Sequence, residues 1–195
     1  MQHEDVRPRI PPLTPPYPPE IDTALRAMMP RHSPVEPLKL FRVLVRHPPL
    51  ATAMTALGRF VLGRGLALDL RDRELVIDRV CARCGCEYEW GVHAASFGAL
   101  AGLSPEQLVA TVAGGPGSPL WSARDALLLG IVDELHDTGT VAATTWQRAE
   151  GFWNEAQRLE LLLIAGWYHA IAFIANGAGV EREEWAARFP SAAER

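Results

Sequence analysis

The stretch Arg83 to His93, RCGCEYEWGVH, gathers many of the side chains in this chain that can carry out chemistry. Two cysteines, two glutamates, a tyrosine, a tryptophan and a histidine lie within its eleven positions. Thiolates attack peroxides and bind metal ions, whereas carboxylates and imidazoles exchange protons near neutral pH. The residue types alone therefore allow a metal site, a redox thiol centre, an acid–base site or a polar part of the core.

Helical spacing places three of these side chains on one face. If a helix starts at Cys86, then Cys86, Glu89 and His93 follow one another at i, i+3 and i+7. Cys86 would lie in the first turn, where backbone N–H groups and the helix dipole stabilise a thiolate. Glu89 and His93 form an i,i+4 pair, so the carboxylate can orient or charge the imidazole. A helical hairpin that turns at Gly85 would bring Glu74 over the same face.

A metal site is a weaker interpretation of this stretch. Cys81 and Cys84 have the C-x2-C spacing of zinc ligands, and Cys86 and His93 are further donors nearby. However, Cys81 and Cys84 fall within a helical pattern, and no second ligand pair follows at zinc-finger spacing. We therefore predict that this chain has no metal site.

The same side chains also have ordinary structural interpretations. A helical cysteine is more often a small buried hydrophobe than a nucleophile, and a single histidine on an apolar face is usually a core residue. Tyr88 and Trp90 are expected in the core, at a subunit contact or in a pocket wall. Only the combination of cysteine, glutamate and histidine on one face favours a functional site.

The elements that must position these residues are helices. From Leu38 onward the apolar residues follow helical spacing, and no segment alternates convincingly with period two. Asp69 or Asp72 can cap the helix that carries Glu74. Ser104, followed by proline and by glutamine three positions later, marks another helix start. We predict an all-α fold of roughly seven to nine helices packed as a bundle.

The N-terminal region has a different composition. Seven of the first 20 residues are proline, so this stretch is predicted to run extended or as polyproline II. We therefore expect a proline-rich extended arm over residues 1–36 and a single helical domain over residues 37–190.

Composition excludes several classes of function. The net charge of −4 and the pI of about 5.9 argue against nucleic-acid binding, which needs a basic face. Three cysteines between positions 81 and 86 do not form a secreted disulfide framework. The N-terminus has no apolar signal segment. The most apolar run, residues 161–175, is shorter than a membrane span and contains His169. We expect a cytoplasmic protein with no membrane partner.

Residues 73–108, RELVIDRVCARCGCEYEWGVHAASFGALAGLSPEQL, resemble the core repeat of the carboxymuconolactone decarboxylase and AhpD-like alkylhydroperoxidase superfamily. The likeness rests on RE at the start of a helix, on CEYEW..H, and on the small residues that precede GLS.EQ. It extends more loosely over most of residues 38–180. The resemblance implies an AhpD-like helical bundle and a homo-oligomer (trimer, hexamer or dimer) with sites near subunit contacts.

The sequence departs from the peroxidase branch of that superfamily at one position. In that branch a glutamate is followed by C-x2-C and by a histidine four residues after the second cysteine. Glu74, Cys86 and His93 match the glutamate, the first cysteine and the histidine. Glu89 stands in place of the second cysteine, which reacts with peroxide in that branch. The motif here is Glu…Cys-x2-Glu-x3-His, so the disulfide cycle of that branch does not carry over unchanged.

The resemblance leaves a redox function open. The chain would be a thiol-dependent hydroperoxidase, an antioxidant oxidoreductase with peroxiredoxin activity. Cys86 would then attack the peroxide, and Cys84, Cys81, another subunit or a small thiol would resolve the product. The expected partners are a small-molecule substrate and a thiol reductant. Three cysteines within six residues favour this hypothesis.

Two other functions also remain open. In the lactone-decarboxylase branch, or a related lyase or isomerase, Glu74, Glu89 and His93 would transfer protons without a metal or organic cofactor. Alternatively, the chain is a non-catalytic oligomeric binding protein whose cluster serves an interface. Glu89 in place of the attacking cysteine motivates the acid–base alternative, but the three cysteines within six residues make the thiol-dependent hydroperoxidase the preferred prediction.

Overall fold

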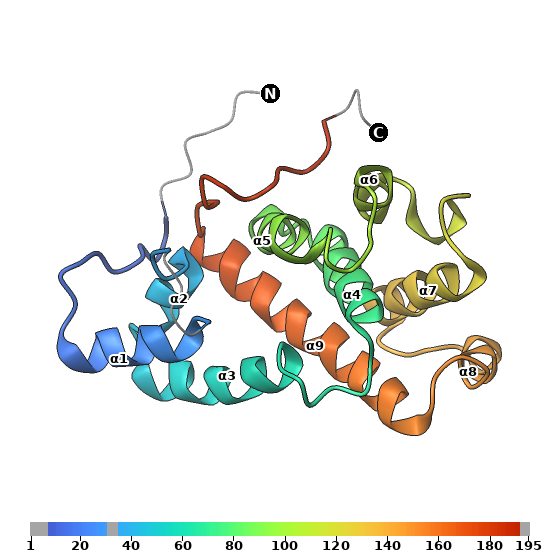
Figure 1. Cartoon of the computed structure of the whole chain (residues 1–195), viewed down its shortest axis with the longest axis horizontal. Coiled ribbons are helices and arrows are strands. Elements are labelled where there is room, and N and C mark those ends of the chain that lie inside the picture. Colours follow the sequence, from blue (N-terminus) through green and yellow to red (C-terminus); the bar gives the residue numbers. More distant parts are fainter. Residues whose placement is uncertain (1–7, 31–34, 192–195) are drawn as a thin grey trace. The chain divides into compact units, whose positions relative to one another are not determined.

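The computed structural model describes residues 8–30 and 35–191, which form nine α-helices and one short 3-10 helix without any strand (Figure 1). The predicted all-α class is confirmed. The chain divides into two compact units, which are described separately. The N-terminal unit comprises residues 1–66 and 174–183, and the central unit comprises residues 67–173 and 184–195.

Three helices pack on one another in the N-terminal unit: α1 (Pro19–Met28), α2 (Lys39–Leu44) and α3 (Pro48–Val61). Their buried apolar side chains are Leu25, Leu40, Val43, Leu44, Ala51, Met54 and Val61. The carboxylate of Glu183 accepts a hydrogen bond from the backbone N–H of Lys39 at 2.6 Å. This bond satisfies one of the donors that the first turn of a helix leaves unpaired.

The N-terminal arm is helical over part of the range that was expected to be extended. Residues 8–18 form no helix, but α1 occupies residues 19–28. Proline is compatible with the first helical position because its missing N–H would be unpaired there, and no further proline follows before Pro30. The helix buries Leu25 completely. Residues 1–7 and 31–34 of the expected arm lie outside the described residues.

A helical hairpin, α4 (Leu70–Arg83) followed by α5 (Glu87–Phe97), is the element of the central unit that carries the motif. The carboxylate of Asp69 caps α4 by accepting the N–H of Asp72 at 2.8 Å, as predicted. Gly85 has a φ of +61°, a left-handed conformation that glycine adopts without a steric penalty. Cys86 then becomes the N-cap of α5. The predicted turn at Gly85 is therefore confirmed.

The rest of the central unit surrounds α4. It contains α6 (Pro105–Ala113), the 3-10 helix η1 (Gly115–Gly117), α7 (Ala123–Thr138) and α8 (Ala143–Ala149). The predicted capping box of Ser104 and Gln107 is present at the start of α6. A second capping box, formed by Ser122 and Asp125, starts α7. Both α6 and α7 pack against α4.

Ion pairs fix α4 against α7. The guanidinium of Arg79 donates two hydrogen bonds of 2.7 Å to Asp133, and Arg71 lies 3.1 Å from Asp125. Bidentate pairs of this kind set orientation as well as distance. Arg79 also donates to the backbone carbonyl of Thr111 at 2.8 Å, which ties α4 to α6. The helix that carries Glu74 is therefore held in one register.

The last helix, α9 (Glu155–Ala178), contains the apolar run 161–175. Its side chains in the core of the central unit include Leu161, Ile164, Ala165, Tyr168 and Ala172. By length and composition α9 is apolar enough to cross a membrane, but core helices of soluble proteins pass the same test. The carboxylate of Glu160, on this helix, accepts the backbone N–H groups of Ala67 and Leu68 at 2.9 Å. These contacts are those of a core helix.

Candidate functional site

The centre of the site is a buried pair between the two helices of the hairpin. His93 Nδ1, on α5, lies 2.7 Å from Glu74 Oε2, on α4. Because a carboxylate can only accept, the imidazole donates this hydrogen bond. The second oxygen of Glu74 accepts from Arg73 Nε, also at 2.7 Å. The predicted approach of Glu74 to His93 is confirmed, and the pair is excluded from solvent, with Glu74 0% and His93 3% exposed.

The other nitrogen of His93 faces two more side chains. His93 Nε2 lies 3.5 Å from Glu89 Oε1 and 3.1 Å from the hydroxyl of Tyr168, on α9. Glu89 Oε2 is buried and has no hydrogen-bond partner among the described residues. Glu89 is the most exposed of these groups, at 8%.

Electrostatics favour the charged form of His93. Burial opposes that charge, but the Coulombic attraction and hydrogen bond of Glu74, together with Glu89, overcome it and raise the pKa of His93 to about 10. At neutral pH the site therefore contains an imidazolium between two carboxyl groups.

Asp78 is a further acid beside this pair, one helical turn after Glu74 on α4. It is 0% exposed, and neither of its carboxyl oxygens has a hydrogen-bond partner in the described part of the chain. Burial raises the pKa of Asp78 well above its usual range, and the negative charge of Glu74 raises it further. Both effects favour the neutral form of Asp78.

Cys86 lies at the start of α5, as predicted, but its thiol is completely buried. Burial raises the pKa of Cys86 to about 12, although backbone hydrogen bonds from Glu89 and Tyr88 favour the thiolate. Desolvation thus outweighs the stabilisation that the start of a helix gives to a thiolate. In this conformation the side chain is a neutral thiol at neutral pH.

The two candidate resolving cysteines have different surroundings. No disulfide joins the three cysteines, all of which lie in the described part of the chain. Cys81 is fully buried on α4, and burial raises its pKa well above the usual range. Cys84 is the C-cap of α4 and is partly exposed, with a pKa that burial also raises. Cys84 is therefore the most accessible thiol of the three.

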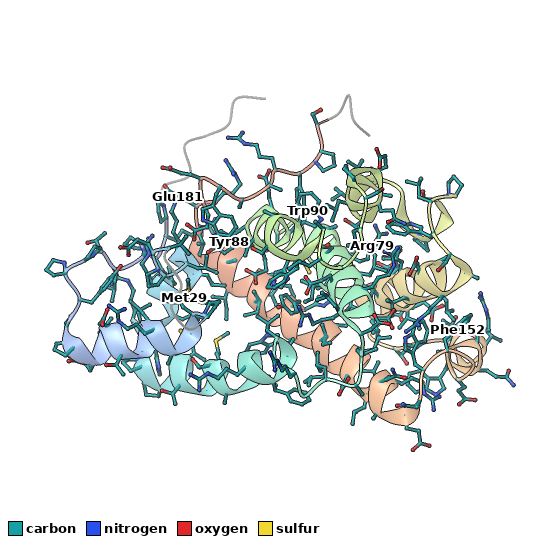
Figure 2. All side chains as sticks on the ribbon, in the orientation of Figure 1. Met29, Arg79, Tyr88, Trp90, Phe152 and Glu181 are labelled. Atoms are coloured by element: carbon teal, nitrogen blue, oxygen red, sulfur yellow. The ribbon has the colours of Figure 1, made fainter. Side chains whose placement is uncertain are left out.

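Tyr88 and Trp90, both labelled in Figure 2, are buried on α5. The indole N–H of Trp90 donates to the hydroxyl of Thr111 at 3.0 Å, and its ring packs against Phe189 at 5.3 Å. These contacts are those of core residues. Neither side chain lines the two surface pockets described next, so their predicted role as pocket residues stays a prediction.

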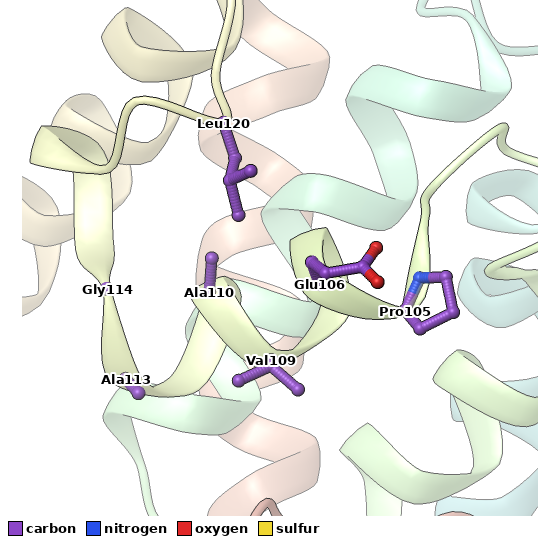
Figure 3. A pocket seen from close by; sticks show the side chains of 7 residues that line it. All are labelled: Pro105, Glu106, Val109, Ala110, Ala113, Gly114 and Leu120. Atoms are coloured by element: carbon purple, nitrogen blue, oxygen red, sulfur yellow. The ribbon is translucent and has the colours of Figure 1, made fainter. Parts of the chain in front are cut away.

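Two surface pockets lie outside this site. One, with a volume of about 480 Å³, lies along α6 (Figure 3), and its lining residues are Pro105, Glu106, Val109, Ala110, Ala113, Gly114 and Leu120. The other, of about 530 Å³, is polar and includes Arg79, Arg83 and His136. Neither is lined by a residue of the Glu74–His93 network.

Sequence reasoning missed three members of the site. Arg73 contacts Glu74, Tyr168 contacts His93, and Asp78 is buried next to both. The i,i+4 spacing of Glu74 and Asp78 on α4 was a signal that both acids share a face. No local pattern links Tyr168 to His93, because they are 75 positions apart.

One family model matches the chain. Residues 48–116 match the carboxymuconolactone decarboxylase family. This segment contains both helices of the hairpin and therefore Glu74, Cys86, Glu89 and His93, but it ends before Tyr168. No curated protein sequence matches the chain at a significant level.

Solved structures share the fold at low sequence identity. An uncharacterized peroxidase-related protein from Silicibacter sp. TM1040 is 16% identical, with a TM-score of 0.78 over 97% of this chain and 100% of that one. The debrominase Bmp8 is 12% identical, with a TM-score of 0.71 over 94% and 95%. A protein of unknown function from Agrobacterium tumefaciens, described as a candidate antioxidant defence protein AhpD, is 20% identical, with a TM-score of 0.64 over 71% and 94%. The AhpD-like helical fold is therefore confirmed.

Proposed function

We propose that this chain is an acid–base enzyme acting on a small organic acid or lactone. The match of residues 48–116 to the carboxymuconolactone decarboxylase family supports this proposal. The observation that carries this proposal is the charged imidazole of His93 between Glu74 and Glu89, where Glu89 keeps one carboxylate oxygen unpaired. A proton acceptor and a proton donor thus lie side by side.

The two groups have complementary roles. The free oxygen of Glu89 takes a proton from an acidic C–H or from water, and the imidazolium of His93 gives a proton to the oxygen or carbon where negative charge develops. Glu74 holds the positive charge of His93, and Arg73 in turn holds Glu74. Tyr168 fixes the ring from its other nitrogen. Such oriented, desolvated groups are what proton transfer at neutral pH requires.

Proton exchange provides the test. The purified chain is incubated in D2O with a panel of small lactones and carboxylic acids that have an acidic C–H, and NMR follows deuterium incorporation and any decarboxylation. We expect turnover by the wild type and a loss of about 100-fold or more in His93→Asn, because general acid–base groups contribute about 10²–10⁴-fold. A folded His93→Asn variant with wild-type exchange would contradict the proposal.

A second candidate is the thiol-dependent hydroperoxidase. The specific observation in its favour is that the backbone groups of Tyr88 and Glu89 form hydrogen bonds with the sulfur of Cys86, an arrangement that stabilises a thiolate. In this reaction the Cys86 thiolate attacks the hydroperoxide, releasing an alcohol and leaving a sulfenic acid. A second thiol, such as Cys84, then forms a disulfide with release of water, and a dithiol reductant restores both thiols.

The acid–base enzyme and the hydroperoxidase make different predictions for variants of Cys86 and Glu89. Dithiol-coupled peroxide consumption that disappears in Cys86→Ser would establish the redox activity. The acid–base proposal predicts that the wild type has little of this activity, whereas Glu89→Cys, which restores the C-x2-C pattern, gains it and loses proton exchange. Efficient peroxide reduction by the wild type without any proton exchange would replace the first proposal by the second.

A further inference from the structure

A second cluster of reactive side chains lies in the central unit and plays no part in the proposed proton transfer. Cys84 ends α4, His136 lies in the last turn of α7, and His169 lies on α9. One potential donor atom from each of these residues lies within 4.8 Å of the other two. Among the residues that the structure describes, this is the one group of three histidine, cysteine or acidic side chains so arranged. The CARCGC stretch with His93 does not form such a group.

The two imidazoles are already oriented towards each other. His136 Nδ1 lies 2.9 Å from His169 Nε2. His169 Nδ1 is 2.8 Å from the backbone carbonyl of Ala165, to which it can only donate a hydrogen bond. His169 therefore presents the lone pair of Nε2 to the cluster, where it accepts a hydrogen bond from His136 Nδ1. A metal ion bound between the two rings would replace this proton, and His136 would carry its proton on Nε2 instead. A histidine whose other ring nitrogen donates to a backbone carbonyl has the outer-shell arrangement typical of metal-bound histidines.

The dimensions and surroundings suit a metal ion. Zinc–nitrogen bonds of about 2.0 Å and zinc–sulfur bonds of about 2.3 Å in a tetrahedron require donor atoms roughly 3.3–3.6 Å apart. All three donor atoms lie within 4.8 Å of one another, and the two imidazole nitrogens, now 2.9 Å apart, need to separate by only a few tenths of an ångström to admit the ion. All three residues are partly exposed, so an ion can enter and a fourth ligand can bind. His136 also lines the polar pocket of about 530 Å³, which offers an entry path. The nearby cation Arg83 is paired with Asp133 and Asp137.

We propose that Cys84, His136 and His169 form a binding site for a borderline-soft divalent transition metal, with Zn²⁺ as its representative. One thiolate and two imidazoles are a donor set that such ions prefer, whereas Mg²⁺ and Ca²⁺ prefer oxygen. Binding displaces the proton of the Cys84 thiol to solvent. It also withdraws Cys84 from any disulfide exchange with Cys86, so metal occupancy would control the most accessible thiol of the chain.

The test is metal binding by the untagged, metal-free, full-length chain. Isothermal titration with Zn²⁺ in buffers of different protonation enthalpy measures affinity, stoichiometry and proton release. Co²⁺ substitution reports coordination through its thiolate-to-cobalt charge-transfer band. We expect one ion per chain, release of a proton and a charge-transfer band. Cys84→Ser should abolish the band and weaken Zn²⁺ binding at least about 100-fold, since loss of an outer-shell partner alone costs about 10–100-fold.

His169→Gln tests the imidazole ligands in the same way, and His47→Gln is the matched control because His47 lies on a different helix, at the start of α3. Circular dichroism of the metal-free variants checks that each one folds. If His169→Gln does not fold, the comparison of Zn²⁺ binding by the wild type and Cys84→Ser decides the proposal. Equal Zn²⁺ binding by the wild type and Cys84→Ser, or no binding by the wild type, would overturn the proposal. Neither result depends on the enzymatic activity, so a failed acid–base assay leaves this test intact.

Discussion

At the scale of single residues, two opposing effects set the charge of each buried group: burial disfavours the charged form, and a neighbouring counter-charge favours it. Burial disfavours charge on His93, Cys86 and Asp78 alike. Only His93 has a directly bonded counter-charge, the carboxylate of Glu74 at 2.7 Å, and only His93 is charged at neutral pH as a result. The spacing of Glu74, Cys86, Glu89 and His93 in the sequence was enough to predict that these residues lie together in a helical hairpin. Their burial could not be predicted, because it depends on helices that are distant in the chain.

Removing the counter-charge should destabilise the fold. Glu74→Gln leaves the buried imidazolium of His93 without its closest anion, so the free energy of unfolding should fall by about 3–5 kcal/mol. Urea denaturation measures the change. Glu106→Gln replaces the same functional group at an exposed position and should cause no comparable loss. Equal effects of the two substitutions would contradict the buried pair.

The stability should also depend on pH through His93. Its pKa is raised in the folded protein, so the folded state binds the proton more tightly than the unfolded state, whose pKa is about 6.5. The stabilisation is fully present below pH 6.5 and is lost as the pH rises through about 10. Denaturation midpoints between pH 6.5 and 10 should fall in the wild type and fall less in His93→Asn. Parallel curves would show that His93 is not charged.

Asp78 should add a separate pH dependence that begins lower. Its folded pKa is raised well above the usual value of about 3.8, so the unfolded state releases its proton first. Stability should therefore decrease as the pH rises above about 4. Asparagine has nearly the shape of the neutral aspartic acid side chain but does not titrate. Asp78→Asn should therefore remove this contribution to the pH dependence of the free energy of unfolding, and the variant should gain stability relative to the wild type between about pH 4 and 6. An unchanged slope in Asp78→Asn would mean that Asp78 is ionised.

At the scale of elements, the hairpin could be predicted in detail because its signals are local. The cap at Asp69 and the turn at Gly85 are features of a few adjacent residues, and both are confirmed. The helix over residues 19–28 was missed because the density of prolines before it dominated the pattern. The partner of His93 on α9, Tyr168, was missed because the contact is tertiary. Local signals therefore predict the hairpin that carries the motif, whereas the contact of Tyr168 with His93 depends on long-range packing.

The segment after α9 covers α5 through a contact that only glycine permits. A Cβ atom at Gly91 would lie 2.2 Å from the backbone carbonyl oxygen of Ala187, whose N–H donates to Gly91 at 3.1 Å. Gly91→Ala should therefore lower the free energy of unfolding by about 1–3 kcal/mol. The matched control is Gly130→Ala on α7, where no atom lies within 4 Å of the new Cβ, and it should be neutral or stabilising. Thermal denaturation compares the two variants.

At the scale of the whole molecule, the AhpD-like fold is established, and residues 48–116 match the carboxymuconolactone decarboxylase family. The assignment of chemistry rests on the site. Neighbours of this fold include a peroxidase-related protein and a debrominase, so the shared architecture does not select a reaction. The expected homo-oligomer and cytoplasmic location stay predictions, which sedimentation velocity and cell fractionation can check. The feature of this chain on which the proposal rests is Glu89 beside the charged imidazole of His93.

The central claim is that Glu89 accepts the proton that the reaction removes, and the rate of proton exchange in Glu89→Gln tests it most directly. The amide has nearly the same shape as the carboxylate but cannot act as a base. On the substrate found in the exchange panel, deuterium incorporation should fall about 100-fold or more while the variant keeps its fold and its Glu74–His93 hydrogen bond. Deuterium incorporation at the wild-type rate in Glu89→Gln would contradict the account.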